Sequence, residues 1–354
     1  KGVGDVLARQ LIQYFGTAAD VFKAKRPTLE KVQGIGSVTA EMIAASRKEA
    51  LLKAEKELVF VEKNKIRIYC ITDADYPVRL KECQDAPVVF YFKGNADLNA
   101  AKIISIVGTR RCTDYGRQHT EELIKDLSVQ YPNLLIVSGL AYGIDICAHR
   151  NALKNKLPTV GVLAHGLDRI YPPLHRNAAI EMLDNGGLLT DFMSGTIPDK
   201  ENFLRRNRLI AGLADVTIVV ESAVRGGSLV TADIAVSYGR DVYAFPGRTS
   251  DMLSGGCNRL IRMNKAGLIT SAEDLIKALC WDIDLNKVSK NVQPELFAKS
   301  DHPVICTLQS KGEIQINILA AELNMPVHKL SSMLFELELE GLIRSYPGGI
   351  YKLN

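Results

Sequence analysis

The segment Ile136–Asp145, "IVSGLAYGID", indicates the fold class because a strand-like pattern gives way to a helix-like one in its middle. It begins as a short apolar run typical of a buried strand, reaches Gly139, and passes a second glycine, Gly143, before a helix-like pattern starts. Glycines between a strand and a helix can form a turn with no further function. They can also let a bulky negative group approach the backbone, because no side chain stands in the way and a helix start offers free N–H groups.

The same strand–turn–helix unit repeats through the middle of the chain. Short runs rich in Val, Ile and Leu are predicted as strands at 102–108, 134–139, 159–164, 186–192, 215–222 and 241–247. Such runs, with little alternation, are typical of parallel strands that helices cover on both faces. We therefore predict an α/β fold with an extended, Rossmann-like, doubly wound sheet. Two further β-like runs, "IRIYCI" and "PVVFYFKG", precede it with a short helix between them.

Helical patterns flank this core on both sides. In 2–16 and 29–45 a G-x-G turn precedes an amphipathic helix, which is a helix-hairpin-helix-like pattern. Its free N–H groups can hold a DNA phosphate; a helical bundle whose glycines only make turns remains the alternative, since few cations flank the turns. After residue 300, three helical stretches and a hairpin around "PGGIYKL" predict a winged helix. The predicted domains are 1–62 (helix-hairpin-helix-like), 63–281 (Rossmann-like core), 282–300 (linker) and 301–354 (winged helix).

Composition limits the class of protein. A chain of 354 residues suggests two or three domains, and a net charge of +4 permits a polyanionic partner without requiring one. The 7 cysteines are odd in number and form no CxxC pair, which favours reduced thiols in a cytosolic protein over disulfides or a zinc site. No apolar run reaches the roughly 18 residues of a membrane span and no signal peptide is recognised, so we expect a cytoplasmic location.

Three turns at the carboxyl ends of the predicted strands share one composition. Each combines small residues with a helix start, and ligands of doubly wound sheets bind at this edge. The turns are Gly108-Thr109-Arg110-Arg111, Ser138-Gly139 and Gly226-Gly227-Ser228. Helix starts favour phosphate, and Arg110 and Arg111 add fixed positive charge with bidentate geometry. The convergence predicts an anion site.

The segment 199–215, "DKENFLRRNRLIAGLAD", indicates that the anion is a polymer. It places one aromatic side chain among cations: Lys200, Phe203, Arg205, Arg206 and Arg208. That is a minimal combination for stacking a base and holding the backbone of single-stranded nucleic acid. On a helix Lys200, Phe203 and Asn207 lie near one face. The alternative is that the arginines form a solvated helix face and Phe203 packs in the core. The neighbouring turns, which favour phosphate, argue against this alternative.

Other ligand classes and catalysis find little support. No G-x-G-x-x-G follows the first strand and no G-x-x-x-x-G-K-[ST] occurs, which argues against a dinucleotide and a nucleoside triphosphatase. Asp145 and His149 stand four apart without a nucleophile, a pattern more typical of a helix-start acid and a polar contact. His165 is interpreted as a turn residue, and Cys112 beside the arginines as incidental. We predict no catalytic residue, no metal, no cofactor and no enzymatic activity.

Several motifs in this order resemble the DNA processing protein A family (DprA, also called Smf). They are "IVGTRRCTDYG", "IVSGLAYGIDICAHRNAL", "VLAHGLDRIYPPLHRNAA", "NFLRRNRLIAGLADVTIVVESAVRGGSLVTADIA" and "YAFPG", preceded by "ITDADYPVRLKECQDAPVVFYFKGN". The resemblance covers about 66–280. It implies a cytosolic dimer that binds single-stranded DNA and loads the RecA recombinase onto it, displacing or working beside single-strand-binding protein. In competent bacteria this delivers DNA taken up in natural transformation to recombination, without catalytic turnover.

Carried over by position, the family's motifs fall on the site already described. Its G-S/T-R turn corresponds to Gly108, Thr109 and Arg110, and its lysine and aromatic to Lys200 and Phe203. Its R-N-R corresponds to Arg206, Asn207 and Arg208, and its G-G-S turn to Gly226, Gly227 and Ser228. The terminal modules fit more loosely: "FELELEGL" is acidic, so we expect the winged helix to serve interactions or weak duplex contact.

Two other functions remain as alternatives. Nucleotide monophosphate N-glycosidases of the lysine-decarboxylase-like group share a related fold and carry P-G-G-x-G-T-x-x-E at the turn matching "RGGSLVTAD", where this chain has no glutamate in register. A duplex-DNA-binding regulator acting through the winged helix is the other.

Overall fold

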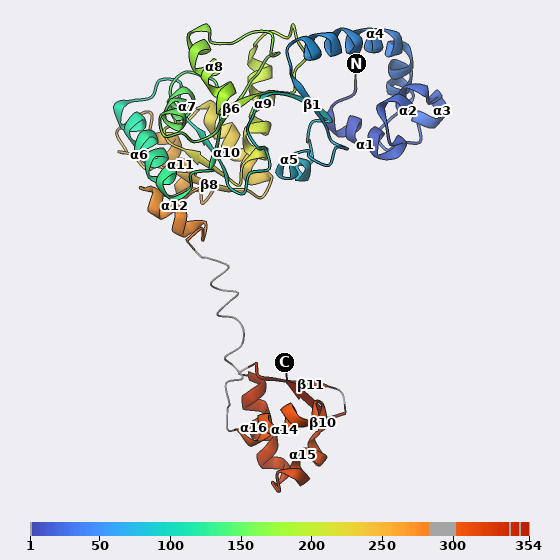
Figure 1. Ribbon diagram of the computed structural model, residues 1–354, viewed down its shortest axis with the longest axis vertical. Coiled ribbons are helices and arrows are strands. Elements are labelled where there is room, and N and C mark those ends of the chain that lie inside the picture. The colour runs from blue at the N-terminus through green and yellow to red at the C-terminus, as the bar shows by residue number, and fades with distance from the viewer. Residues whose placement is uncertain (1, 283–301, 340, 347, 354) are drawn as a thin grey trace. The chain divides into compact units, whose positions relative to one another are not determined.

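The structure is a computed structural model that describes residues 2–282, 302–339, 341–346 and 348–353. It divides into two compact units, Lys1–Ala278 and Leu279–Asn354 (Figure 1). The predicted linker 282–300 lies outside the described residues except for its first position.

A nine-stranded sheet forms the centre of the first unit in the described part of the chain. Its order is β1-β2-β6-β5-β4-β3-β7-β8-β9, with β1 and β2 antiparallel at one edge and the remaining strands parallel to one another. The bounds are Arg67–Cys70, Val89–Gly94, Ile103–Val107, Leu135–Gly139, Thr159–Val162, Gly186–Thr190, Val216–Val219, Asp241–Ala244 and Gly267–Leu268. The six predicted strands are thus confirmed as β3 to β8, and the two-residue β9 is an addition.

The strand order reverses between β3 and β7. From β3 the chain builds outward through β4, β5 and β6, and then returns to place β7 on the other side of β3. In a doubly wound sheet this switch point leaves a crevice beyond the carboxyl ends of the two strands. The turns after β3 and β7 carry two of the three predicted anion-binding motifs.

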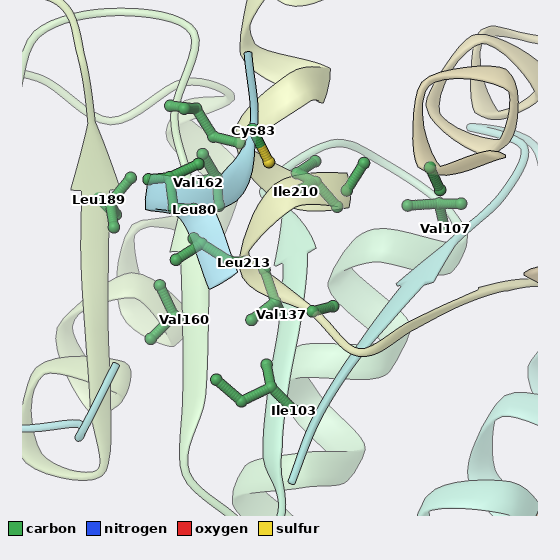
Figure 2. Close-up of a cluster of buried hydrophobic side chains, with 14 of the residues drawn as sticks. Leu80, Cys83, Ile103, Val107, Val137, Val160, Val162, Leu189, Ile210 and Leu213 are labelled. Atoms are coloured by element: carbon green, nitrogen blue, oxygen red, sulfur yellow. The ribbon is translucent and has the colours of Figure 1, made fainter. Parts of the chain in front are cut away.

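Helices cover both faces of the sheet, as a doubly wound fold requires. They are α5 Val78–Glu82, α6 Asp114–Gln130, α7 Ile144–Lys154, η1 Pro173–His175, α8 Arg176–Asp184, α9 Lys200–Leu213, α10 Gly227–Ser237, α11 Gly255–Arg262 and α12 Ala272–Ala278. Figure 2 shows Ile210 and Leu213 of α9 among side chains of the strands, including Val137 and Val160. Each buried aliphatic side chain of this kind contributes about 1.5–3 kcal/mol, so α9 is fixed to the sheet along its inner face.

The N-terminal helices have a core of their own, beside the sheet in the same unit (Figure 1). They are α1 Asp5–Phe15, α2 Ala18–Lys23, α3 Arg26–Leu29 and α4 Ser37–Lys63. The two predicted G-x-G turns directly precede α1 and α4, whose N-caps are Gly4 and Gly36. Neither of these helix starts has a side-chain cap.

The second unit is a winged helix. Helices α14 Pro303–Lys311, α15 Ile316–Glu322 and α16 Val327–Leu339 pack with a small antiparallel sheet of β10 Ile314–Gln315, β11 Ile343–Tyr346 and β12 Ile350–Leu353. The third helical stretch, expected from the sequence over 326–346, was predicted too long. Helix α16 ends at Leu339, and Gly341 takes a left-handed φ of 73° before β11 begins.

None of the described helices is both long and apolar enough to cross a lipid bilayer.

Candidate functional site

A groove of about 750 Å³ lies at the switch point. Its walls come from the turns after β3 and β7, the segment leading into α9, and the first turns of α9 and α10. It is lined by most of the predicted site residues: Gly108, Thr109, Arg110, Lys200, Phe203, Arg206, Asn207, Gly226, Gly227 and Ser228. Segments far apart in the sequence therefore meet at one edge of the sheet.

Phe203 is the half-buried aromatic centre of this groove. The guanidinium carbon of Arg110 lies 4.9 Å from its ring centroid and that of Arg206 5.8 Å away. The ring of Tyr171 approaches to 6.1 Å between centroids. Cations within about 6 Å of an aromatic ring attract it, so Phe203 and Arg110 form a flat, positively charged surface on which a base can stack.

The groove supplies cations and backbone donors together. Arg110, Lys200 and Arg225 are exposed and line it. Helix α10 starts at Gly227 with no side-chain cap, so no side chain occupies its first N–H groups and they are available to an anion. The start of α9 is different, because the carboxylate of Asp199 accepts the N–H of Asn202 at 2.8 Å. A phosphate in the groove would therefore meet the start of α10 and these three side chains.

The turn after β4 is occupied by the protein itself. Ser138 and Gly139 are buried. A Cβ built on Gly139 would stand 2.1 Å from Nη1 of Arg206 and 2.5 Å from Oδ2 of Asp145. Gly143 has a φ of 78°, and a Cβ there would lie 2.1 Å from the carbonyl oxygen of Thr109. The two glycines admit neighbouring protein groups, so the prediction that Ser138 and Gly139 contact DNA is corrected.

Arg206 lines the groove but is nearly buried, so most of its side chain is enclosed by the protein. Its side chain is 4% exposed and its Nη1 donates to the carbonyl oxygen of Val162 at 2.5 Å. Burial lowers the pKa of Arg206 to about 10, against the raising effect of Asp145, so the guanidinium stays charged near neutral pH. Burial likewise raises the pKa of Asp145, which Arg206 opposes. The opposite charges of Arg206 and Asp145 offset each other's cost of burial at the bottom of the groove, beside the ring of Phe203.

Arg208 does not reach the groove at all. It is 6% exposed and forms ion pairs with Asp191 at 2.5 Å and with Asp5 of α1 at 3.1 Å. It also donates to the backbone carbonyl of Asp85. The arginine therefore joins α9 to other elements of the unit. Both of its terminal nitrogens are bonded inside the protein, away from the groove, so the structure does not place Arg208 where its predicted contact with DNA requires.

Arg111 is exposed but does not line the groove. The groove residues missed from the sequence include a cation and an aromatic, Arg225 and Tyr171. Arg225 had a usable signal, since it directly precedes the Gly226-Gly227 helix start. Tyr171 had none, because it reaches the groove from the loop after β5.

The residues weighed for catalysis have structural partners. His149 is fully buried, with Nδ1 2.7 Å from the hydroxyl of Thr159 and Nε2 2.7 Å from the carbonyl oxygen of Gly139. Burial lowers its pKa to about 4, so the ring is neutral. Burial raises the pKa of the Cys112 thiol, which is the opposite of what a reactive thiolate requires.

Fold and groove together define a class of protein. It is a doubly wound domain that offers a cationic, aromatic-centred groove at its switch point and is flanked by a helix-hairpin-helix region and a winged helix. Models of three families match in the same arrangement: DNA recombination-mediator protein A over residues 67–280, the DprA winged helix domain over 297–349, and a SAM-like helix-hairpin-helix tandem over 1–49. The chain belongs to the DprA/Smf family.

Relatives extend over much of the chain. It is 40% identical over 215 residues to DNA processing protein DprA of Streptococcus pneumoniae, covering 61% of this chain and 75% of that protein. It is 31% identical over 305 residues to protein Smf of Escherichia coli, covering 85% and 81%. The X-ray structure of the S. pneumoniae protein superposes with a TM-score of 0.68 at 34% identity, over 78% of this chain and 93% of that one. DNA processing protein A from Helicobacter pylori, solved for its single-stranded DNA binding mode, gives 0.55 at 31% identity, over 61% and 96%.

Proposed function

We propose that this protein binds single-stranded DNA in the groove at its switch point and loads a RecA-type recombinase onto the bound strand. The observation that carries the proposal is the meeting of Phe203, Arg110, Lys200 and Arg225 with the uncapped start of α10 in one groove. A flat aromatic surface accepts any base, while cations and N–H groups hold the phosphates, so the groove suits an unpaired strand of varied sequence.

Family membership and the single-stranded DNA binding of the H. pylori relative support the wider role. We propose a non-enzymatic homodimer that acts on strands taken up in natural transformation, with single-strand-binding protein as a further partner. RecA loading and dimer formation are parts of this proposal that need their own measurements.

Strand binding is tested by fluorescence anisotropy with a labelled oligothymidine on wild type, an Arg110→Ala, Lys200→Ala double variant and a Lys125→Ala control. Lys125 lies in the later part of α6 and does not line the groove. The double variant should bind more weakly and lower the slope of log K against log salt by about 1.4, because about one phosphate contact is lost with each cation and each contact on a single strand contributes about 0.7. Equal affinity of the double variant and wild type would refute the site.

Mediator activity is tested by RecA filament formation on strands precoated with single-strand-binding protein. Addition of the wild-type protein should shorten the delay before filaments grow, and the double variant should not. A comparison of single with double strands in a mobility-shift assay addresses duplex regulation, and release of free base from adenosine monophosphate would favour the glycosidase. Light scattering should give twice the mass of one chain.

A further inference from the structure

Helix α9 presents different residues to two different neighbours. Phe203 and Arg206 face the groove. Arg205 and Arg208 lie two and five positions from Phe203, which places them on the far side of a helix with 3.6 residues per turn. The helix that carries the groove aromatic is therefore also in contact with another part of the unit.

That other part is helix α1. The carboxylate of Asp5, in its first turn, lies 3.3 Å from Nη2 of Arg205 and 3.1 Å from Nη2 of Arg208. Both arginines also pair with Asp191, at 3.3 and 2.5 Å. The side chains of Arg208 and Asp191 are 7% and 1% exposed, so this pair is shielded from solvent and from salt. Asp5 is 25% exposed and adds a partly buried carboxylate to it.

Helix α4 holds the segment that leads into α9. Glu57 is 6% exposed. Its carboxylate accepts the N–H of Ser194 at 2.9 and 3.1 Å and the hydroxyl of Ser194 at 2.6 Å. On the other side of the same segment, the N–H of Gly195 donates to Asp168 at 2.9 Å. Hydrogen bonds to an ionised carboxylate are about twice as strong as neutral ones, so Glu57 fixes the approach to Lys200.

We propose that Asp5 and Glu57 are positioning residues for the DNA groove, through which the N-terminal helices set the orientation of α9 and of the segment before it. The inference rests on the proposed function, because it concerns the same groove. Neither carboxylate lines the groove. Without them Lys200 and Phe203 sample more orientations, and affinity falls in proportion to the binding-competent fraction.

The sign of the effect separates positioning from simple electrostatics. Removing an acidic charge near a phosphate-binding surface strengthens attraction to a polyanion. Positioning requires the opposite, weaker binding after the acid is neutralised. The two explanations cannot both account for one result.

The experiment uses the full chain, a labelled oligothymidine as probe, and the variants Asp5→Asn, Glu57→Gln and Glu55→Gln. Glu55 is the matched control, since it lies on α4 two residues from Glu57 and is exposed. Asp5→Asn and Glu57→Gln should each raise Kd about tenfold, as a fall of the competent fraction to about a tenth would. The salt slope should stay that of wild type because no phosphate contact is removed. Glu55→Gln should bind as wild type or tighter.

Wild-type or tighter binding by both Asp5→Asn and Glu57→Gln overturns the proposal. If Lys200→Ala weakens binding in that same experiment, the groove stands and only the positioning role fails; if Lys200→Ala also binds as wild type, the proposed function fails.

Hydrogen exchange distinguishes a local loss of order from unfolding of the whole domain. Exchange in 191–204 should rise in both variants while that of β3 stays slow, and unchanged exchange in 191–204 also counts against the proposal. Ser194→Ala, which keeps every charge, should weaken binding to a smaller extent.

Discussion

A glycine in a strand-to-helix turn leaves room beside the backbone. The sequence does not show whether a ligand or a protein group takes that room. At Gly227 the space beside the Cα is open. At Gly139 the same space holds the guanidinium of Arg206 and the carboxylate of Asp145. Two residues of one type in similar strand-to-helix turns thus have different functions, one beside a ligand groove and one beneath it.

We expect Gly139→Ala to destabilise the fold by about 1–3 kcal/mol, because the added methyl overlaps a buried charged pair that has little room to move. Gly227→Ala is the matched control. Nothing lies within 4 Å of a methyl placed on Gly227, and alanine favours a helix, so stability should be unchanged or higher. Urea unfolding measures both, and equal midpoints for wild type and Gly139→Ala would contradict the packing argument.

Phe203→Ala should weaken binding of an oligothymidine by about 1–3 kcal/mol, the typical contribution of one stacked base. Phe203→Trp keeps a flat ring and should bind within a few-fold of wild type. Anisotropy titrations at one fixed salt concentration give both values. Stacking is not the role of Phe203 if the alanine variant binds as tightly as the tryptophan variant.

At the scale of one element, α9 places the cations of one sequence segment on different sides of a helix, where they have different partners. Lys200 is exposed at the groove, Arg206 is buried beneath Phe203, and Arg205 and Arg208 pair with acids on the far side. In the sequence these residues read as one basic segment. The helical period separates them, and the elements packed against each side decide which cations remain available to a ligand.

Arg208→Met should cost about 3–5 kcal/mol of stability, because it leaves the buried carboxylate of Asp191 without its main partner. The double variant Arg208→Met, Asp191→Asn removes both charges and should be more stable than the single one. Urea unfolding of the two variants and wild type tests this. A double variant less stable than the single one would show that the cost is packing and not unpaired charge.

At the scale of the whole molecule, buried histidines couple the central sheet to pH. The ring of His149, on α7, bonds to Gly139 of β4 and Thr159 of β5 and is inaccessible to solvent. Burial also lowers the pKa of His165 and His175. All three must take up a proton when the protein unfolds in acid, and their effect adds in the same direction.

For His149 the unfolded side chain binds its proton near 6.5 and the folded one near 4. Stability is therefore level above about pH 6.5 and falls as the pH drops from there towards 4, by about 3 kcal/mol from this residue. His149→Gln should be less stable than wild type at pH 7 but lose less on acidification to about pH 4.5. Unfolding midpoints at several pH values give the two slopes, and identical slopes would exclude His149 as a source of the acid sensitivity.

The sheet and the location of the site could both be predicted from the order of residues alone. Uninterrupted Val, Ile and Leu runs must be covered on both faces, and the turns that follow β3 and β7 must then meet at the switch point. This is why Arg110, Lys200, Phe203 and Gly226 could be assigned to one groove in advance.

Which polar groups are exposed in that groove depends on packing and could not be predicted in this way. Arg206 is buried and bonds to Val162. Arg208 is buried and forms an ion pair with Asp5, which lies far away in the sequence on α1. Arg225 and Tyr171 enter the groove from loops whose course depends on packing. A local sequence pattern shows the chemistry of each side chain. The exposure of that side chain depends on segments distant in the sequence, which only folding brings into contact with it.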